Sequence, residues 1–351
     1  MNPFSYVAPT DAVEALAALG DHESNGMALG AAKFIAGGTN LLDLMKENVM
    51  RPARLIDING LPYERIEETA SGGLMLGALA RNADTAYHPA VRSRYPLLSA
   101  AILAGASPQL RNMATNGGNL LQRTRCYYFY DSTVPCNKRE PGTGCSAIGG
   151  LSRQHAILGA SEHCIATHPS DMCVALAALG AIVHVQSPSS SRQIPFADFH
   201  RLPGDRPDQD THLAFDELIT HVELPEARGF AGHSVYLKIR ERASYAFALV
   251  SVAAALELAE DGSIRQARLA LGGVAHKPWR DTEVEQALMG AMPSEPVFAK
   301  AADALLRTAH GQGANDFKIP LAHRAIVRAL SLAVQGTVTN TGERLNGEES
   351  V

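Results

Sequence analysis

Apolar and polar positions alternate near the start of the chain in a way that predicts a β-α-β unit. The apolar run "KFIAGG" at 33–38 has the length of a short strand and ends in a glycine pair. "TNLLDLMKENVM" follows with helical periodicity, and "RLIDING" is apolar again over the length of a strand. Upstream, "PTDAVEALAALG" predicts a helix that starts at its Thr-Asp pair and stops at Gly20. We therefore expect residues 31–60 to form one compact β-α-β unit.

The middle of the chain mixes strands and helices. "RIEETASGGLMLGAL" predicts a hairpin that turns at 71–73, and 83–106 has the pattern of helix. "SDMCVALAALG" predicts another helix, followed by the strand "AIVHVQ". "LPGDRPDQDTH" is polar and rich in proline, which is typical of a long surface loop.

From about residue 230 the pattern changes to an antiparallel sheet followed by helices. "HSVYLKIR" and "YAFALVSVAAALELAEDGSIRQARLALGGV" predict strands with a turn at Asp261-Gly262. "DTEVEQALMG", "EPVFAKAADALLRTAHG" and "LAHRAIVRALSLAVQ" predict the helices. Sheet followed by helices indicates a separate α+β domain, and the polar end "TVTNTGERLNGEESV" predicts a loose tail.

Composition narrows the class of protein. The 351 residues are 46% hydrophobic, which is enough for two or three packed subdomains. The net charge of −5 argues against a general nucleic-acid binder. The chain has no apolar run long enough for a membrane span, and its first residues lack the pattern of an export signal. We expect a protein that is made in the cytoplasm without a signal of its own.

Two glycine stretches suit a bound phosphate. "IAGGTNLLDLM" places Gly37, Gly38, Thr39 and Asn40 between a strand and a helix, where main-chain N–H groups are open to a ligand. "QLRNMATNGGNLLQR" at 109–123 repeats the arrangement. Neither matches the Rossmann or Walker A pattern. Each glycine pair alone is also typical of a simple tight turn. Two such loops, each flanked by Thr and Asn, favour a shared pyrophosphate.

The stretch "RCYYFYDSTVPCNKREPGTGC" at 125–145 is too broken for a helix and too irregular for a strand. It contains three of the five cysteines, and the odd count argues against full disulfide pairing. Cys173 lies on an apolar helical face, where cysteine behaves as a small hydrophobe. The other four lie in loops, and their spacing alone is a weak metal signal. A 4Fe–4S cluster, a structural zinc ion and inert thiols are all open at this point.

Five segments together resemble the FAD-binding medium subunit of the xanthine dehydrogenase or molybdenum hydroxylase family. They are "KFIAGGTNLLDLMK", "QLRNMATNGGNLLQRTRC", "ATHPSDM", "KIRERASYAFALVSVAAAL" and "LALGGVAHKPWR". The resemblance covers roughly residues 3–335 and is closest to the bacterial periplasmic aldehyde oxidoreductase subtype. It implies an α+β fold: an FAD-binding domain of the vanillyl-alcohol-oxidase type in two subdomains, then a domain like the C-terminal domain of carbon monoxide dehydrogenase flavoprotein. We expect limits at 1–60, 61–228 with an iron–sulfur loop at 123–165, 229–335, and a flexible tail at 336–351.

The resemblance also implies the residues that contact FAD. In the first loop these are Lys33, Phe34, Ile35, Ala36, Gly37, Gly38, Thr39, Asn40 and Leu41; in the second they are Arg111, Thr115, Gly118, Asn119 and Gln122. Asp171 resembles the family acid near the adenosine, although Asp171 or Ser170 could instead cap the following helix. Lys238 and Tyr245 are expected near the isoalloxazine, with ordinary strand positions as the alternative.

For the cysteines, the resemblance implies one 4Fe–4S cluster held by Cys126, Cys136, Cys145 and Cys164, which match the cluster positions of the subtype. The neighbouring aromatic side chains would then give the cluster a dry shell.

The implied function is electron transfer within an oxidoreductase of three kinds of subunit. A large subunit with the molybdenum cofactor would oxidise an aldehyde, and a small subunit with two 2Fe–2S clusters would pass electrons to the flavin of this chain. No catalytic residue is expected here. The alternatives are a flavin subunit of a hydroxybenzoyl-CoA reductase or N-heterocycle hydroxylase, a stand-alone FAD oxidoreductase, and a metal-stabilised scaffold. The periplasmic subtype also implies export alongside a small subunit with a twin-arginine signal.

Overall fold

A small parallel sheet opens the fold. The structure is a computed structural model that describes residues 1–20, 32–338 and 344–345. Strands β1 (Ser5–Val7), β3 (Arg54–Asp57) and β2 (Ala32–Ile35) lie side by side in that order, with α1 (Ala12–Ala17) and α2 (Leu41–Lys46) between them in sequence. The β-α-β unit is confirmed over 32–57; residue 31 lies outside the described residues. Its third strand, β1, was not expected.

A five-stranded antiparallel sheet follows, in the order β4-β5-β8-β6-β7. Its strands are β4 (Ile66–Glu68), β5 (Leu74–Gly77), β6 (Ile182–Gln186), β7 (Ser191–Pro195) and β8 (Leu218–Leu224). The predicted hairpin is confirmed, since Ile66 pairs with Leu76 across the turn. The segment 202–212 contains no helix or strand, as its proline-rich sequence predicts.

Three short helices replace the single helical stretch expected over 83–106. They are α3 (Asn82–Tyr87), α4 (Pro89–Arg94) and α5 (Pro96–Ala104). Proline cannot donate its backbone nitrogen within a helix, so Pro89 and Pro96 each begin a new one. Shorter turns of helix are α6 (Pro108–Arg111), α7 (Asn116–Leu120), α8 (Tyr127–Tyr130) and α10 (Phe196–Phe199). The helix α8 corrects the expectation that 125–145 contains none.

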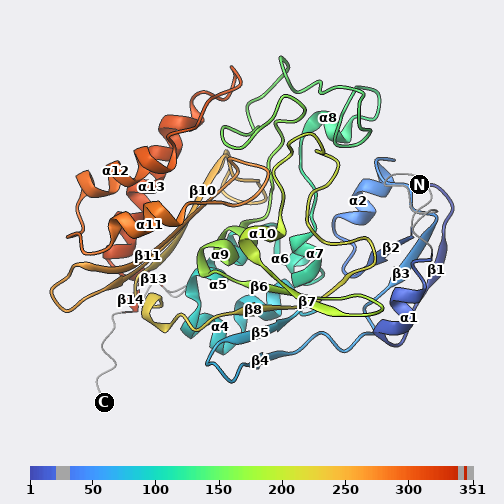
Figure 1. Cartoon of the computed structure of the whole chain (residues 1–351), viewed down its shortest axis with the longest axis horizontal. Coiled ribbons are helices and arrows are strands. Elements are labelled where there is room, and N and C mark those ends of the chain that lie inside the picture. The colour runs from blue at the N-terminus through green and yellow to red at the C-terminus, as the bar shows by residue number, and fades with distance from the viewer. Residues whose placement is uncertain (21–31, 339–343, 346–351) are drawn as a thin grey trace.

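The C-terminal part is the predicted antiparallel sheet covered by helices. The strand order is β12-β11-β10-β9. The strands are β9 (Ser234–Ile239), β10 (Val250–Leu258), β11 (Ile264–Gly272) and β12 (Trp279–Arg280); the helices are α11 (Thr282–Leu288), α12 (Glu295–Leu305) and α13 (Lys318–Val334). A single turn of 3₁₀-helix, η2 (Arg228–Phe230), precedes this sheet. Figure 1 shows these helices on one side of the sheet and the rest of the chain on the other.

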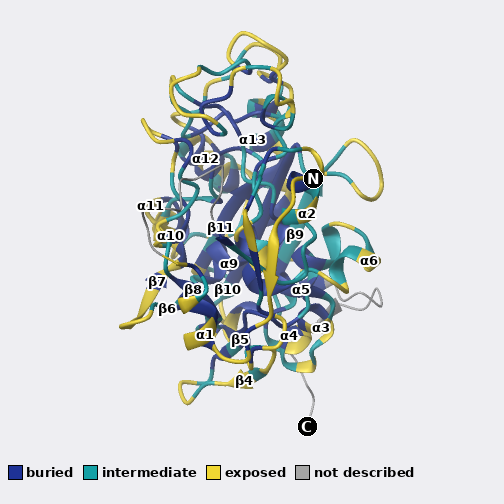
Figure 2. Ribbon diagram, turned by 90° about the vertical axis from the view of Figure 1, so that its right-hand side faces the viewer, coloured by how far each residue is buried: buried dark blue, intermediate teal, exposed yellow. Residues whose placement is uncertain are grey.

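The helix α9 (Asp171–Leu179) joins the two large sheets. All nine of its residues are buried, and it packs against α5, β10 and β11. The β10 alanines Ala253 and Ala255 share its core, whereas Val252 and Leu256 belong to the core under α13. Small side chains on one face of β10 let α9 approach closely. The deep burial of β10 and β11 is visible in Figure 2.

The chain remains anchored just after α13. Thr337, at the start of the expected tail, is buried and its hydroxyl accepts a hydrogen bond from the backbone N–H of Ser234 (2.7 Å). The two-residue strands β13 (Thr337–Val338) and β14 (Arg344–Leu345) pair with each other. Within the described ranges, no helix is both long and apolar enough to cross a bilayer.

A buried ion pair connects α9 to β9. The Asp171 carboxylate accepts from Lys238 Nζ (2.7 Å) and from the Tyr236 hydroxyl (2.6 Å), and both charged side chains are at least 90% buried. The helix cap is Ser170, whose hydroxyl accepts from the Cys173 N–H (3.1 Å). Of the two candidates for the cap, the structure therefore selects Ser170, and Asp171 connects two layers of the fold.

We expect Lys238→Met to destabilise the protein by about 3–5 kcal/mol, because it leaves the Asp171 carboxylate buried without its cation. Urea unfolding measures the change. The control is Arg265→Met, which removes an exposed ion pair with Glu257 (3.3 Å) and should cost less than about 1 kcal/mol. Adding Asp171→Asn to Lys238→Met should recover part of the loss. Equal losses in the two single variants would contradict the role of this ion pair.

Candidate functional site

One large cavity lies between the first sheet, the cysteine-containing loops and the C-terminal sheet. Its volume is about 1700 Å³, larger than the few hundred to roughly 1000 Å³ of an ordinary small-molecule pocket. Both glycine loops line it, together with residues 208–215 and 217–219, and with Lys238, Glu241, Arg242 and residues 245–247, from distant parts of the chain. A cavity of this size, lined by several segments that are far apart in the sequence, suits a dinucleotide better than a single small metabolite.

The first glycine loop is held by a main-chain contact that only glycine permits. A Cβ on Gly37 would lie 1.9 Å from the carbonyl oxygen of Met113, which belongs to the second loop segment. Gly38 has a φ of +70°, a conformation that side chains disfavour. These two glycines serve different needs: Gly37 allows the two loops to touch, and Gly38 allows the turn into α2.

Asn40 connects the loop to the chain beyond the second glycine pair. Its side-chain oxygen accepts from the Arg123 N–H (2.8 Å), but its buried amide nitrogen, Nδ2, has no partner within the protein. A buried donor without an acceptor is uncommon because desolvating it is costly. Since Asn40 lines the cavity, a ligand oxygen would satisfy this donor.

The second glycine loop starts α7 beside the first. The Thr115 hydroxyl accepts from the Gly118 N–H (3.2 Å) and caps the helix. A Cβ on Gly117 would approach Ala78 to 3.1 Å, so this turn also packs tightly against its neighbour. Asn119 donates to Asn82 Oδ1 (2.7 Å), which fixes the amide at the cavity wall.

Positive charge gathers along this wall. Burial lowers the pKa of Lys33, and the nearby charge of Arg123 lowers it further. Arg123 and Lys138 both contact the Asp210 carboxylate, at 2.7 and 2.5 Å. Burial alone would raise the pKa of Asp210, but the charges of Arg123 and Lys138 outweigh it and hold that pKa well below its usual range. Lys33 is left facing like charge, which an anionic ligand would relieve.

The structure brings every predicted FAD contact to this cavity. These residues are Lys33, Phe34, Ile35, Ala36, Gly37, Gly38, Thr39, Asn40, Leu41, Arg111, Thr115, Gly118, Asn119, Gln122, Asp171, Lys238 and Tyr245. Their contact with FAD remains a prediction. Lys238 is a β9 strand residue whose ammonium group is taken by Asp171 and the Ala104 carbonyl (3.0 Å). Tyr245 is not on a strand; it lies on an exposed loop with a φ of +52°.

The cavity fits FAD on three observations. Its volume accommodates a dinucleotide, its wall carries an unpartnered buried donor at Asn40, and its basic side chains can offset a pyrophosphate. Sequence reasoning did not identify Arg123, Lys138 and Asp210 as part of this wall. Their pairing depends on the loop at 202–212 folding over the second glycine loop, and no short motif signals such a contact.

The four loop cysteines also come together. The backbones of Cys136 and Cys145 form an isolated antiparallel β-bridge, and both thiols are free. The Cys164 thiol hydrogen-bonds to the Cys145 sulfur. This hydrogen bond holds the pKa of Cys145 at about 6, while burial and the same contact raise that of Cys164. Burial raises the pKa of Cys126 to about 11, and Cys136 and Cys145 lie close enough to raise it further. The loops that carry them lie around α8 at the top of Figure 1.

Two buried histidines contact these sulfurs. His155 Nε2 lies 3.1 Å from Cys126 Sγ, and His276 Nε2 lies 3.3 Å from Cys164 Sγ. Burial lowers the pKa of His155 to about 4 and that of His276 well below its usual value. Neutral imidazoles can donate one N–H bond each to a metal-bound thiolate. His276 was missed from sequence because it lies more than a hundred residues beyond the cysteines.

The arrangement of the four thiols suits a polynuclear cluster better than a single zinc ion. Tetrahedral zinc with Zn–S bonds of about 2.3 Å would bring its sulfurs to about 3.8 Å from one another. Among the described residues, no three of these cysteines have sulfurs within 4.8 Å of each other. His163, a loop histidine that could also have served as a zinc ligand, is half-exposed and lies 3.6 Å from the Glu162 carboxylate. The expected dry shell is found only in part: Phe129, Cys136 and Cys164 are buried, whereas Cys126 and Cys145 are partly exposed and Tyr127 is exposed.

The family comparisons cover almost the whole chain. Residues 2–227 match the FAD binding domain in molybdopterin dehydrogenase, and residues 235–333 match the CO dehydrogenase flavoprotein C-terminal domain. These matches confirm the expected fold class. The limits predicted at 60 and 228 stay predictions.

Curated relatives and solved structures agree with this. The aldehyde oxidoreductase FAD-binding subunit PaoB of Escherichia coli is 54% identical over 86% of this chain and 91% of its own length. The glyceraldehyde dehydrogenase medium chain of Sulfolobus acidocaldarius is 30% identical over 82% of this chain and 81% of its own. A structure of carbon monoxide dehydrogenase from Hydrogenophaga pseudoflava aligns with a TM-score of 0.72 at 27% identity, covering 95% of this chain and 97% of that one.

The cavity, the two glycine loops and both family matches lead to one conclusion: this chain belongs to the FAD-binding medium subunits of the molybdenum hydroxylase family, the flavin subunits of oxidoreductases.

Proposed function

We propose that this chain is the FAD- and 4Fe–4S-containing electron-transfer subunit of a heterotrimeric, molybdenum-dependent aldehyde oxidoreductase. The main support is the cavity that both glycine loops share, together with Cys126 and Cys136, which pack in the same apolar cluster as Leu44 of α2. No catalytic residue is assigned to the chain, because substrate oxidation belongs to a molybdenum-containing large subunit. A small subunit with 2Fe–2S clusters would deliver the electrons.

The residues of the cavity would hold FAD by its polar centre. The loops at 36–40 and 115–119 would accept the pyrophosphate close to the main chain, and Lys33 would offset its charge. When bound, FAD supplies a redox group that takes electrons singly or in pairs and passes them to an external acceptor. The protein's contribution is orientation: Asn40 offers its free amide donor, and the Asp171–Lys238 pair fixes the wall contributed by β9.

Cys126, Cys136, Cys145 and Cys164 would hold the cluster. His155 and His276 would each donate to one of its thiolates, which stabilises added negative charge and favours the reduced state. The loop is fixed beside the flavin site: Arg125 contacts Asp43 of α2 (2.5 Å), and Phe129 and Cys136 pack on Leu44. Cluster and flavin would thus rest on one helix.

The substrate class rests on the relatives. The PaoB subunit is named for an aldehyde oxidoreductase, and the Sulfolobus medium chain for a glyceraldehyde dehydrogenase. More distant relatives are named for caffeine and nicotine, at 27% and 29% identity. The higher identity favours an aldehyde. The partners that we propose are the large and small subunits of such an enzyme.

We expect Gly37→Ala to abolish FAD binding, because the added Cβ would collide with the Met113 carbonyl and push the two glycine loops apart. Flavin absorbance per purified chain measures this. Gly38→Val should also lose FAD, but its positive φ makes any side chain strained there.

The matched control is Gly60→Ala, since a Cβ at Gly60 meets only the Pro9 carbonyl at an ordinary 3.7 Å and its φ is not positive. Full flavin content in a folded Gly37→Ala variant would remove the shared pyrophosphate site from the proposal.

The cysteines provide a second test. We expect serine at Cys126, Cys136, Cys145 or Cys164 to cost most of the iron and sulfide, because a cubane needs four thiolates. Cys173→Ser should leave both unchanged, since Cys173 lies on the buried helix α9 and not in the loops that carry the other four cysteines. Metal and sulfide analysis with electron paramagnetic resonance of the reduced protein reports the outcome. Zinc without sulfide in the wild-type chain would sink the cluster assignment.

An experiment on the isolated chain can distinguish electron transfer from substrate oxidation. We expect the chain to bind FAD and exchange electrons with artificial dyes but to oxidise no aldehyde, because it lacks the molybdenum site. Adding the large and small subunits should give aldehyde-dependent flavin reduction, which rapid-mixing spectroscopy measures. Aldehyde turnover by the isolated chain would favour a stand-alone flavoenzyme instead.

A further inference from the structure

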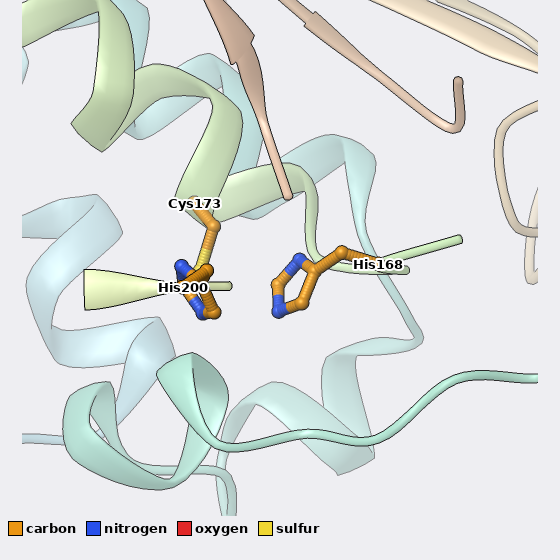
Figure 3. Close-up of side chains that lie close together, drawn as sticks. All are labelled: His168, Cys173 and His200. Carbon is orange, nitrogen blue, oxygen red and sulfur yellow. The ribbon is translucent and has the colours of Figure 1, made fainter. Parts of the chain in front are cut away.

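A second group of metal-binding side chains lies apart from the four loop cysteines. His168, Cys173 and His200 each offer one ligand atom, and these atoms all lie within 4.8 Å of one another. Figure 3 shows the two imidazole rings and the thiol converging from three segments. His168 precedes α9, Cys173 is on its first turn, and His200 directly follows α10.

The histidines in this group have nitrogen atoms without partners. His200 is 2% exposed, and its Nε2 donates to the Leu120 carbonyl (2.8 Å), so its Nδ1 carries a free lone pair. His200 Nδ1 and His168 Nε2 have no hydrogen-bond partner in the protein. Buried polar atoms are normally paired. These two unpaired ring nitrogens lie beside a thiol, so a ligand that bonds to both nitrogens would satisfy them.

The rest of the geometry resembles an oriented metal site. In such sites a ligating histidine commonly donates its other ring N–H to a backbone carbonyl, as His200 does to Leu120. The two imidazole rings have centroids 4.3 Å apart, and Phe199 packs against His200 at 4.9 Å, which limits ring rotation. Burial keeps both histidines neutral, the state that binds a metal, by lowering their pKa values.

We propose that His168, Cys173 and His200 form a binding site for a soft, closed-shell divalent metal ion of the zinc type, separate from the iron–sulfur cluster. Imidazole and thiolate are the ligands that zinc prefers, and three protein ligands leave one position open. His168 and His200 line the large cavity, so the open position and the route of entry face it.

Charge and protons balance in this step. Binding forms one metal–sulfur and two metal–nitrogen bonds, and the Cys173 thiol releases its proton to solvent. In the metal-free protein His168 Nδ1 accepts from the Ser170 N–H (3.4 Å), so binding of the metal through Nε2 moves the ring proton to Nδ1 and breaks this long contact. The occupied site has one net positive charge, which the nearby Asp210 carboxylate favours, whereas Lys138 opposes it at His168 and Lys277 opposes it at His200. The site is independent of the cluster, since none of its ligands is among the four loop cysteines.

The test uses the full chain with its iron–sulfur content intact, equilibrated with Zn²⁺ before and after FAD is bound, because the open position faces the cavity proposed for FAD. X-ray absorption at the zinc edge after equilibration with one equivalent of Zn²⁺ should show one sulfur at about 2.3 Å and nitrogen ligands at about 2.0–2.1 Å. This measurement needs no variant. A spectrum with four sulfurs, or with none, would overturn the proposal because the zinc would then lie in the cluster loop or on the surface.

Variants supply the second arm. Zinc affinity by equilibrium dialysis should fall on the order of a hundredfold in Cys173→Ala and in His200→Gln. It should stay unchanged in His310→Gln, whose exposed ring is bonded only to Gln312 (3.1 Å). Iron, sulfide and flavin content should match wild type in all three, which verifies folding. Equal zinc affinity in Cys173→Ala and wild type would refute the site.

Discussion

The contact between the backbone of Gly37 and the carbonyl of Met113 is the constraint on which the cavity depends. It joins two loops that are far apart in sequence and leaves no room for a side chain. Because the loops touch, Asn40 reaches the backbone of Arg123, and Arg123 in turn reaches Asp210. The basic wall of the cavity follows from this chain of contacts. A methyl group at Gly37 would therefore also disturb the contacts between Asn40, Arg123 and Asp210.

The buried helix α9 connects the cavity to the C-terminal sheet. Its first turn carries the Asp171 carboxylate that pairs with Lys238, and the Cys173 thiol that faces His168 and His200. Alanines on β10 and Gly272 on β11 make room for it; a Cβ at Gly272 would lie 2.5 Å from Val174. Close packing thus brings polar side chains of α9 into apolar surroundings, where each needs a specific partner.

The cysteine segment has little regular structure of its own and is held by distant parts of the chain. The Asn137 amide donates to the His163 carbonyl (3.1 Å), which ties the Cys136 loop to the Cys164 loop. Lys318 of α13 is fully buried and donates to the His155 carbonyl (2.8 Å), so the C-terminal domain supports a histidine that contacts Cys126. Hydrogen bonds within the cysteine loops and from the C-terminal domain together fix this irregular segment.

Local sequence was enough to predict the β-α-β unit, the hairpin, the C-terminal sheet with its helices, and the glycine-loop residues that line the cavity. These features depend on local periodicity and on residue types whose backbone preferences are strong, such as Gly37 and Gly38. The fold was needed to show that Ser170 caps α9 while Asp171 pairs with Lys238. It was also needed to show that His276 and His200 face cysteine sulfurs. Such partners meet through packing between elements far apart in the chain, and a side chain's neighbours across a core leave no mark on its local sequence.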